Sequence, residues 1–74
     1  MDPKEIFELI VKADERLKYA TGDKAELRVR QAKDLLAQAI REARAIGNQG
    51  LVDQAQRRLA DLDAPAPDGS DGQP

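Results

Sequence analysis

Cysteine and histidine are both absent from this 74-residue sequence, and their absence excludes several kinds of site. Without cysteine there can be no disulfide and no thiolate-bound metal. Without histidine, and with Ser70 isolated near the C-terminus, none of the usual nucleophile–base arrangements can be assembled. The acidic residues fall on the polar arcs of the expected helices and do not converge on a bundle interior. We therefore predict that the chain is not an enzyme and has no catalytic residues, metal site, cofactor or small-molecule substrate.

Aromatic residues make up only 3% of the sequence, and long apolar runs are missing as well. With Phe7 and Tyr19 as the only aromatics, there is no platform on which single-stranded nucleic acid could stack. No segment approaches the roughly 20 apolar residues of a membrane span, and the N-terminus lacks the basic and apolar regions of a secretory signal. We expect a cytoplasmic protein that does not enter a membrane.

What the sequence does contain is a hydrophobic fraction of 41% that is arranged with helical periodicity. Between Asp23 and Gly47 the apolar residues alternate at spacings of four and three, which places them on one side of a single long helix. They are Ala25, Val29, Ala32, Leu36, Ala39, Ala43 and Ile46. Every seventh residue on one line of this stripe is alanine, so a second helix can approach closely. The spacing predicts a long helix against which the rest of the chain packs.

A shorter helix is expected before the long one. It begins after Asp2, which can cap the helix, and Glu5 stands where a capping box places an acidic residue. Gly22, which can adopt a left-handed conformation, is expected to end it. One face of this helix carries Ile6, Ile10, Ala13, Leu17 and Ala20, again spaced by four and three.

The remaining boundaries are predicted from the same kinds of signal. Asp23 with Glu26 repeats the capping-box spacing at the start of the long helix, and Gly47-Asn48 ends that helix and caps a third. We predict helices near 3–20, 24–46 and 49–62. The side chains expected to be buried are Ile10, Leu17, Ala32, Leu36, Ala39, Ala43, Val52, Ala55 and Leu59.

The fold class predicted from these elements is all-α. Short links between amphipathic helices favour antiparallel neighbours, hence an up-down-up three-helix bundle with a long central helix. We expect this domain to occupy residues 1–63. Residues 64–74, an acidic segment rich in proline, glycine and alanine, have nothing to bury and are expected to be a disordered tail.

Residues 32–62 resemble a tetratricopeptide repeat (TPR). Ala32, Leu36 and Ala39 fit the small–large–small pattern of the second helix of such a repeat, and the run from Glu42 to Asn48 is similar to the turn that follows it. The helix up to Leu62 then resembles the opening helix of a next repeat. The long helix starts earlier than in that family, and there is no second full repeat. The resemblance implies a TPR-like fold and protein binding through a groove between helices.

Three apolar residues lie away from the expected stripes. Phe7 and Val11 stand one turn apart on another side of the first helix, and Leu27 lies on the back of the long helix. Isolated surface hydrophobes are normal, and Leu27 could serve the second neighbour of the long helix. The alternative is that they bind a partner. We predict a small non-catalytic protein–protein interaction module of a bacterial type, a helix-groove or homodimeric adaptor whose partner is a protein, a second copy of itself included.

A different function is favoured by the basic middle of the chain. Five arginines could contact a nucleic-acid backbone from the second and third helices, and they are Arg28, Arg41, Arg44, Arg57 and Arg58. Cations late in a helix also complement its dipole, which accounts for Arg41 and Arg44 without a ligand. We keep nucleic-acid binding as the alternative to protein binding.

Overall fold

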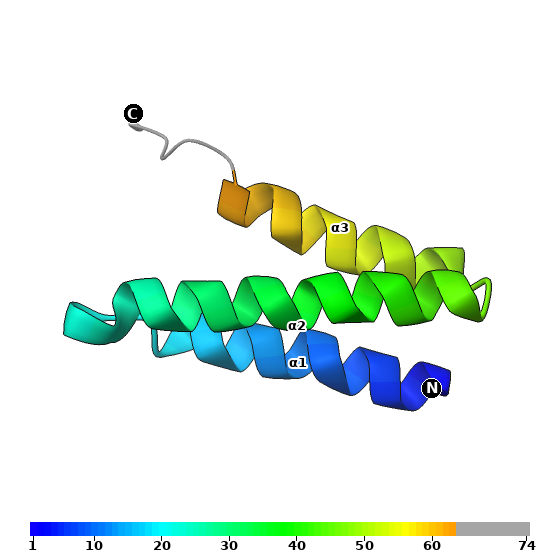
Figure 1. Cartoon of the computed structure of the whole chain (residues 1–74), viewed down its shortest axis with the longest axis horizontal. Coiled ribbons are helices and arrows are strands. Elements are labelled where there is room, and N and C mark those ends of the chain that lie inside the picture. Colours follow the sequence, from blue (N-terminus) through cyan, green and yellow to red (C-terminus); the bar gives the residue numbers. More distant parts are fainter. Residues whose placement is uncertain (64–74) are drawn as a thin grey trace.

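The computed structural model describes residues 1–63 of the chain, which fold into three α-helices and one short 3-10 helix (Figure 1). The α-helices are α1 (Pro3–Lys18), α2 (Ala25–Ala45) and α3 (Gln49–Asp63), and the 3-10 helix η1 (Gly22–Lys24) precedes α2. No strand occurs in this part of the chain. The all-helical prediction is confirmed, and each predicted helix boundary agrees with the structure to within two residues. The tail predicted for residues 64–74 lies outside the described residues.

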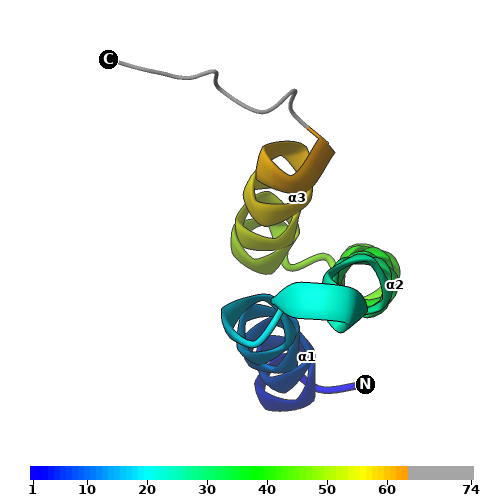
Figure 2. The same ribbon diagram turned by 90° about the vertical axis from the view of Figure 1, so that its left-hand side faces the viewer.

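The longest helix, α2, is the centre of the arrangement. Both α1 and α3 pack mainly against α2 and only slightly against each other. Figure 2 looks along α2 and shows α1 and α3 at different positions around it. Each flanking helix therefore depends on α2 for most of its packing. None of the helices in residues 1–63 is both long and apolar enough to cross a membrane.

The core is made of small and aliphatic side chains from all three helices. Three alanines of α2, Ala32, Ala39 and Ala43, expose none of their surface, whereas Ala25 at the start of the helix is half-buried. The other buried residues are Ile6, Ile10, Ala13, Leu36, Ile40, Leu51, Val52 and Ala55. Alanine at the contact lets helix axes come close, and the bulk needed to fill the space comes from the branched residues around it.

Two of the residues predicted to be buried are not, and one residue of the predicted α2 stripe does not lie on it. Leu17 and Leu59 were expected to be buried, but each is only half-buried against the core, because each lies toward the end of a flanking helix. Ile46, the last member of the predicted α2 stripe, is 42% exposed. It follows the final helical residue as the C-cap of α2, so it no longer lies on the helix face.

Three helix ends form as the sequence predicts. At the start of α1, the Glu5 backbone N–H donates to Asp2 Oδ1 at 2.9 Å, and the Asp2 N–H donates to Glu5 Oε1 at 3.1 Å, a complete capping box. At the end of α2, Gly47 has a φ of +69° and Asn48 N–H donates to the Ala43 carbonyl at 2.8 Å. Asn48 Oδ1 then accepts from the Leu51 N–H at 3.1 Å and caps α3.

The turn between α1 and α2 differs from the prediction. Asp23 does not cap α2, because it lies inside η1, and the N-cap position falls on Lys24, which makes no side-chain capping bond. Gly22 does have a positive φ of +63°, but α1 has already ended at Lys18 with Tyr19 as its C-cap. The left-handed residue therefore begins the 3-10 turn into α2 and does not close α1.

Candidate protein-interaction surface

The largest side chain left uncovered on α1 is Phe7, at 46% exposure, and Val11 one turn later is 38% exposed. Each follows a fully buried isoleucine, Ile6 or Ile10, by one residue. One residue advances an α-helix by about 100°. When the two isoleucines face α2, Phe7 and Val11 are therefore turned onto a side of α1 that neither α2 nor α3 covers.

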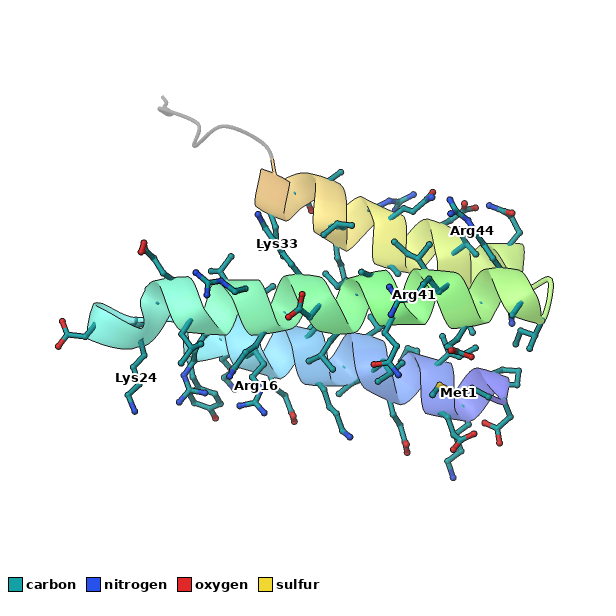
Figure 3. All side chains as sticks on the ribbon, in the orientation of Figure 1. Met1, Arg16, Lys24, Lys33, Arg41 and Arg44 are labelled. Carbon is teal, nitrogen blue, oxygen red and sulfur yellow. The ribbon has the colours of Figure 1, made fainter. Side chains whose placement is uncertain are left out.

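Phe7 and Val11 form the floor of a shallow hollow of about 510 Å³, open to solvent, that lies entirely on α1. Charged side chains line it, in the order Lys4, Glu8, Lys12 and Glu15, so the sign of the charge alternates along the helix. Nitrogen-tipped and oxygen-tipped side chains alternate along the edge of α1 that faces away from α2 (Figure 3). We call these six residues the α1 outer face.

The surface continues from the α1 outer face toward the end of the helix. Lys12 and Glu15 also line a second hollow, of about 470 Å³, together with Arg16, Tyr19 and Arg28. Tyr19 is 61% exposed, and the Lys18 Nζ atom lies 5.9 Å from the centre of its ring. An exposed aromatic, two exposed apolar residues and alternating charges thus follow one helix along most of its length.

Leu27 is as exposed as Phe7, at 48%, but it belongs to a different part of the surface. It lies in the first turn of α2, next to the link from the end of α1, whereas Phe7 lies in the second turn of α1. It lines neither of the two hollows on α1. Of the three apolar residues predicted to bind a partner, the structure brings Phe7 and Val11 together and leaves Leu27 apart.

A further apolar surface lies on the first half of α2. Ala25 and Val29, with Glu26, Arg30 and Lys33, line an open hollow of about 360 Å³. The sequence places both apolar residues on the stripe that faces the core, yet they are only half-buried. The reason is length: α3 has 15 residues and α2 has 21, so α3 does not reach the beginning of α2.

The five arginines proposed as a nucleic-acid surface are not brought into one group. Arg28 lies beside Tyr19 near the start of α2. Arg41 follows it by thirteen residues, roughly 20 Å along a helix axis at about 1.5 Å per residue. Arg41 and Arg44 stand three residues apart and are both exposed near the C-terminal end of α2 (Figure 3), and Arg57 is exposed on α3. These arginines therefore do not form one continuous basic surface along which a nucleic-acid backbone could bind.

Arg58, the fifth arginine, is engaged within the chain. Its Nε donates to both carboxylate oxygens of Asp14, at 3.0 and 3.1 Å, and its Nη1 donates to the Gln54 carbonyl at 3.3 Å. This joins α3 to α1. Asp14 stands four residues before Lys18, a spacing that allows an ion pair within α1, but in the structure it faces Arg58. Within residues 1–63, no three His, Cys, Asp or Glu side chains are grouped so that they could hold a metal.

Comparison with protein-family models, with curated proteins and with solved structures finds no match to this chain. The candidate surface is therefore assigned from the residues of this chain alone.

Sequence reasoning missed most of the polar part of that surface. Lys4, Glu8, Lys12 and Glu15 are of the residue types that ordinary solvated helix positions carry, and the sequence predicts no role for Tyr19. These residues can be identified only when the charges and the apolar residues are considered together. Four charges of alternating sign, spaced by four, four and three, flank the two apolar residues that lie off the stripe. Neither the charges nor the apolar residues are unusual alone.

Proposed function

We propose that this chain is a small non-catalytic protein–protein interaction module, and that its binding surface is the α1 outer face. The observation that carries the proposal is that Phe7 and Val11 stay exposed in a hollow, although each directly follows an isoleucine that is fully buried in the core. Apolar surface framed by polar residues is a feature of protein-binding sites. An elongated face on one helix fits the apolar stripe of a second helix laid along it.

The proposal includes the finer fold type predicted above, an up-down-up, TPR-like three-helix unit. It is supported by the reversal of the chain at each of the two links in Figure 1 and by the small residues between α2 and its neighbours. The proposed binding surface is not the groove between helices that the resemblance to a repeat implies. The hollow between α1 and α2 is lined mainly by polar residues, Arg16, Gln31, Asp34 and Gln38 with Leu35, so the outer side of α1 is the better surface.

A capture experiment with a matched control tests this assignment. The chain is immobilised, exposed to an extract of its native cell, and compared with Phe7→Asp/Val11→Asp and with Leu27→Asp. We expect the double variant to lose capture while its helical circular dichroism is unchanged, because both side chains are outside the core. Leu27→Asp adds a charge at an equally exposed position and should capture as well as the original chain. Retained capture by a folded double variant would exclude the α1 outer face.

Salt dependence separates protein binding from the arginine alternative. Contacts to nucleic-acid phosphates weaken steeply as salt rises from about 50 to about 200 mM, whereas apolar contacts change little. We expect capture that is insensitive to nuclease and much less sensitive to salt than phosphate contacts are. Substituting Arg28, Arg41, Arg44 and Arg57 by glutamine should leave it intact, and loss of nucleic-acid capture in that variant would favour the alternative.

A further inference from the structure

We propose that the partner bound by the α1 outer face is a second copy of this chain, with the two α1 helices antiparallel about a two-fold axis. This inference rests on the proposed function, since it names the partner of the same surface. It is carried by the order of charges along the hollow, Lys4, Glu8, Lys12 and Glu15, which becomes its own complement when the helix is reversed.

The charge pairing follows from the symmetry. In a two-fold contact the same patch is used twice, so residue i of one copy meets residue j of the other and the reverse. In an antiparallel pair of helices, Lys4 then lies opposite Glu15 of the second copy, and Glu8 lies opposite Lys12. The midpoint of the first pair falls between Leu9 and Ile10 and that of the second falls on Ile10, so one axis serves both.

The apolar residues fit the same axis. The midpoint between Phe7 and Val11 is Leu9, so each Phe7 lies against Val11 of the other copy. Met1 and Tyr19, exposed by 45% and 61%, lie just beyond the two ends of α1, and the same reversal brings these ends of the two copies together. A methionine sulfur against an aromatic ring is a favourable contact. In residues 1–63, four of the six exposed large hydrophobic residues are accounted for by this one arrangement.

The four charges are also available for such a contact. Within the described part of the chain, no ion pair or side-chain hydrogen bond engages Lys4, Glu8, Lys12 or Glu15. Glu8 and Lys12 stand one turn apart, at a spacing that allows an ion pair within the helix, but they are not joined. In the antiparallel pair each has an oppositely charged partner on the second copy.

Charge reversal with mixing is the decisive experiment, because all four residues are exposed and lie outside the core. Lys4→Glu/Lys12→Glu makes the hollow wholly acidic, and Glu8→Lys/Glu15→Lys makes it wholly basic. Sedimentation should show the full-length original chain as a dimer that forms with rising concentration. Each variant alone should dimerise at least about tenfold more weakly, since like charges then face each other. An equimolar mixture of the two variants should regain dimerisation.

Arg41→Glu/Arg44→Glu is the matched control, since it changes the net charge as much as the acidic variant does but lies on α2. It should dimerise as the original chain does. The antiparallel direction of the two α1 helices is tested with single introduced cysteines, which are unique because the chain has no native cysteine. Glu8→Cys mixed with Lys12→Cys should form the mixed disulfide faster than either forms its own.

Three outcomes would overturn the inference: an original chain that stays monomeric at high concentration, charge-reversed variants that dimerise undiminished alone, or faster disulfide formation by identical cysteines. The proposed function is tested separately. If the chain is monomeric but still captures another protein through Phe7 and Val11, the second copy is wrong and the interaction surface stands. If capture is also insensitive to these two residues, both proposals fail.

Discussion

α1 and α3 both pack on α2, but the core-facing apolar side chains of α1 are buried more completely than those of α3. Ile6, Ile10 and Ala13 of α1 expose nothing, and on the same face only Leu17, near the end of the helix, is half-buried. In α3, burial is confined to the first half, at Leu51, Val52 and Ala55, and the residues that follow on the same face, Leu59 and Leu62, are only half-buried. Figure 1 shows the same difference, because α3 moves away from α2 toward its C-terminal end.

The difference shows what apolar spacing does and does not determine. A spacing of four and three selects one side of a helix, and both α1 and α3 obey it. It does not determine the angle at which that side meets the neighbouring helix, which depends on how side chains of both helices interdigitate. Two equally regular stripes can therefore be buried to different depths.

The largest expected change in stability comes from two side-chain truncations, one in α1 and one in α3, which compare how firmly the two helices are packed. Ile10→Ala removes a fully buried side chain and should lower the free energy of unfolding by about 2–5 kcal/mol. Leu59→Ala removes a side chain of similar size that is half-exposed, so its loss should be less than half as large. Urea unfolding at one fixed protein concentration measures both. Equal losses would mean that α3 is held as firmly as α1.

Helix capping provides a second comparison, between the two ends of α2. Asn48 caps α3 through its side chain, so Asn48→Ala should cost about 1 kcal/mol of stability. Asp23 makes no capping bond at the other end, so Asp23→Ala should change the stability by less than about 0.5 kcal/mol. Thermal unfolding of the two variants checks the order. A larger loss for Asp23→Ala would restore the capping role that the sequence predicts for it.

The sequence predicts the elements of this fold well because the signals that define them are local. A capping box at Asp2 and Glu5 and a left-handed glycine at Gly47 both involve residues within one turn of each other. The turn at Gly22–Lys24 was predicted wrongly because two local options compete there: Asp23 could cap α2, or it could join the 3-10 turn that Gly22 starts.

The candidate surface is less predictable, because it depends on what the neighbouring helices leave uncovered. The off-stripe positions of Phe7 and Val11 were visible in the sequence, and both are exposed in the structure. The half-burial of Ala25 and Val29 was not, because it results from the shorter length of α3. The contact between Asp14 and Arg58 joins residues that are 44 positions apart, and no local pattern indicates it.

That contact carries the smallest expected effect, and it links the two helices compared above. Arg58 and Asp14 have side chains that are 35% and 47% exposed, so solvent screens their attraction and the coupling should be only about 0.2–1 kcal/mol. A double-mutant cycle with Asp14→Ala and Arg58→Ala isolates it. A cycle with Asp14→Ala and Lys18→Ala is the control, since the structure does not join that pair, and its coupling should be smaller.

Because the Asp14 contact holds α3 where its own packing is loosest, Arg58→Ala should also speed amide exchange in the last turns of α3 more than elsewhere. Uniform exchange, or equal coupling in both cycles, would show that α3 is positioned by α2 alone.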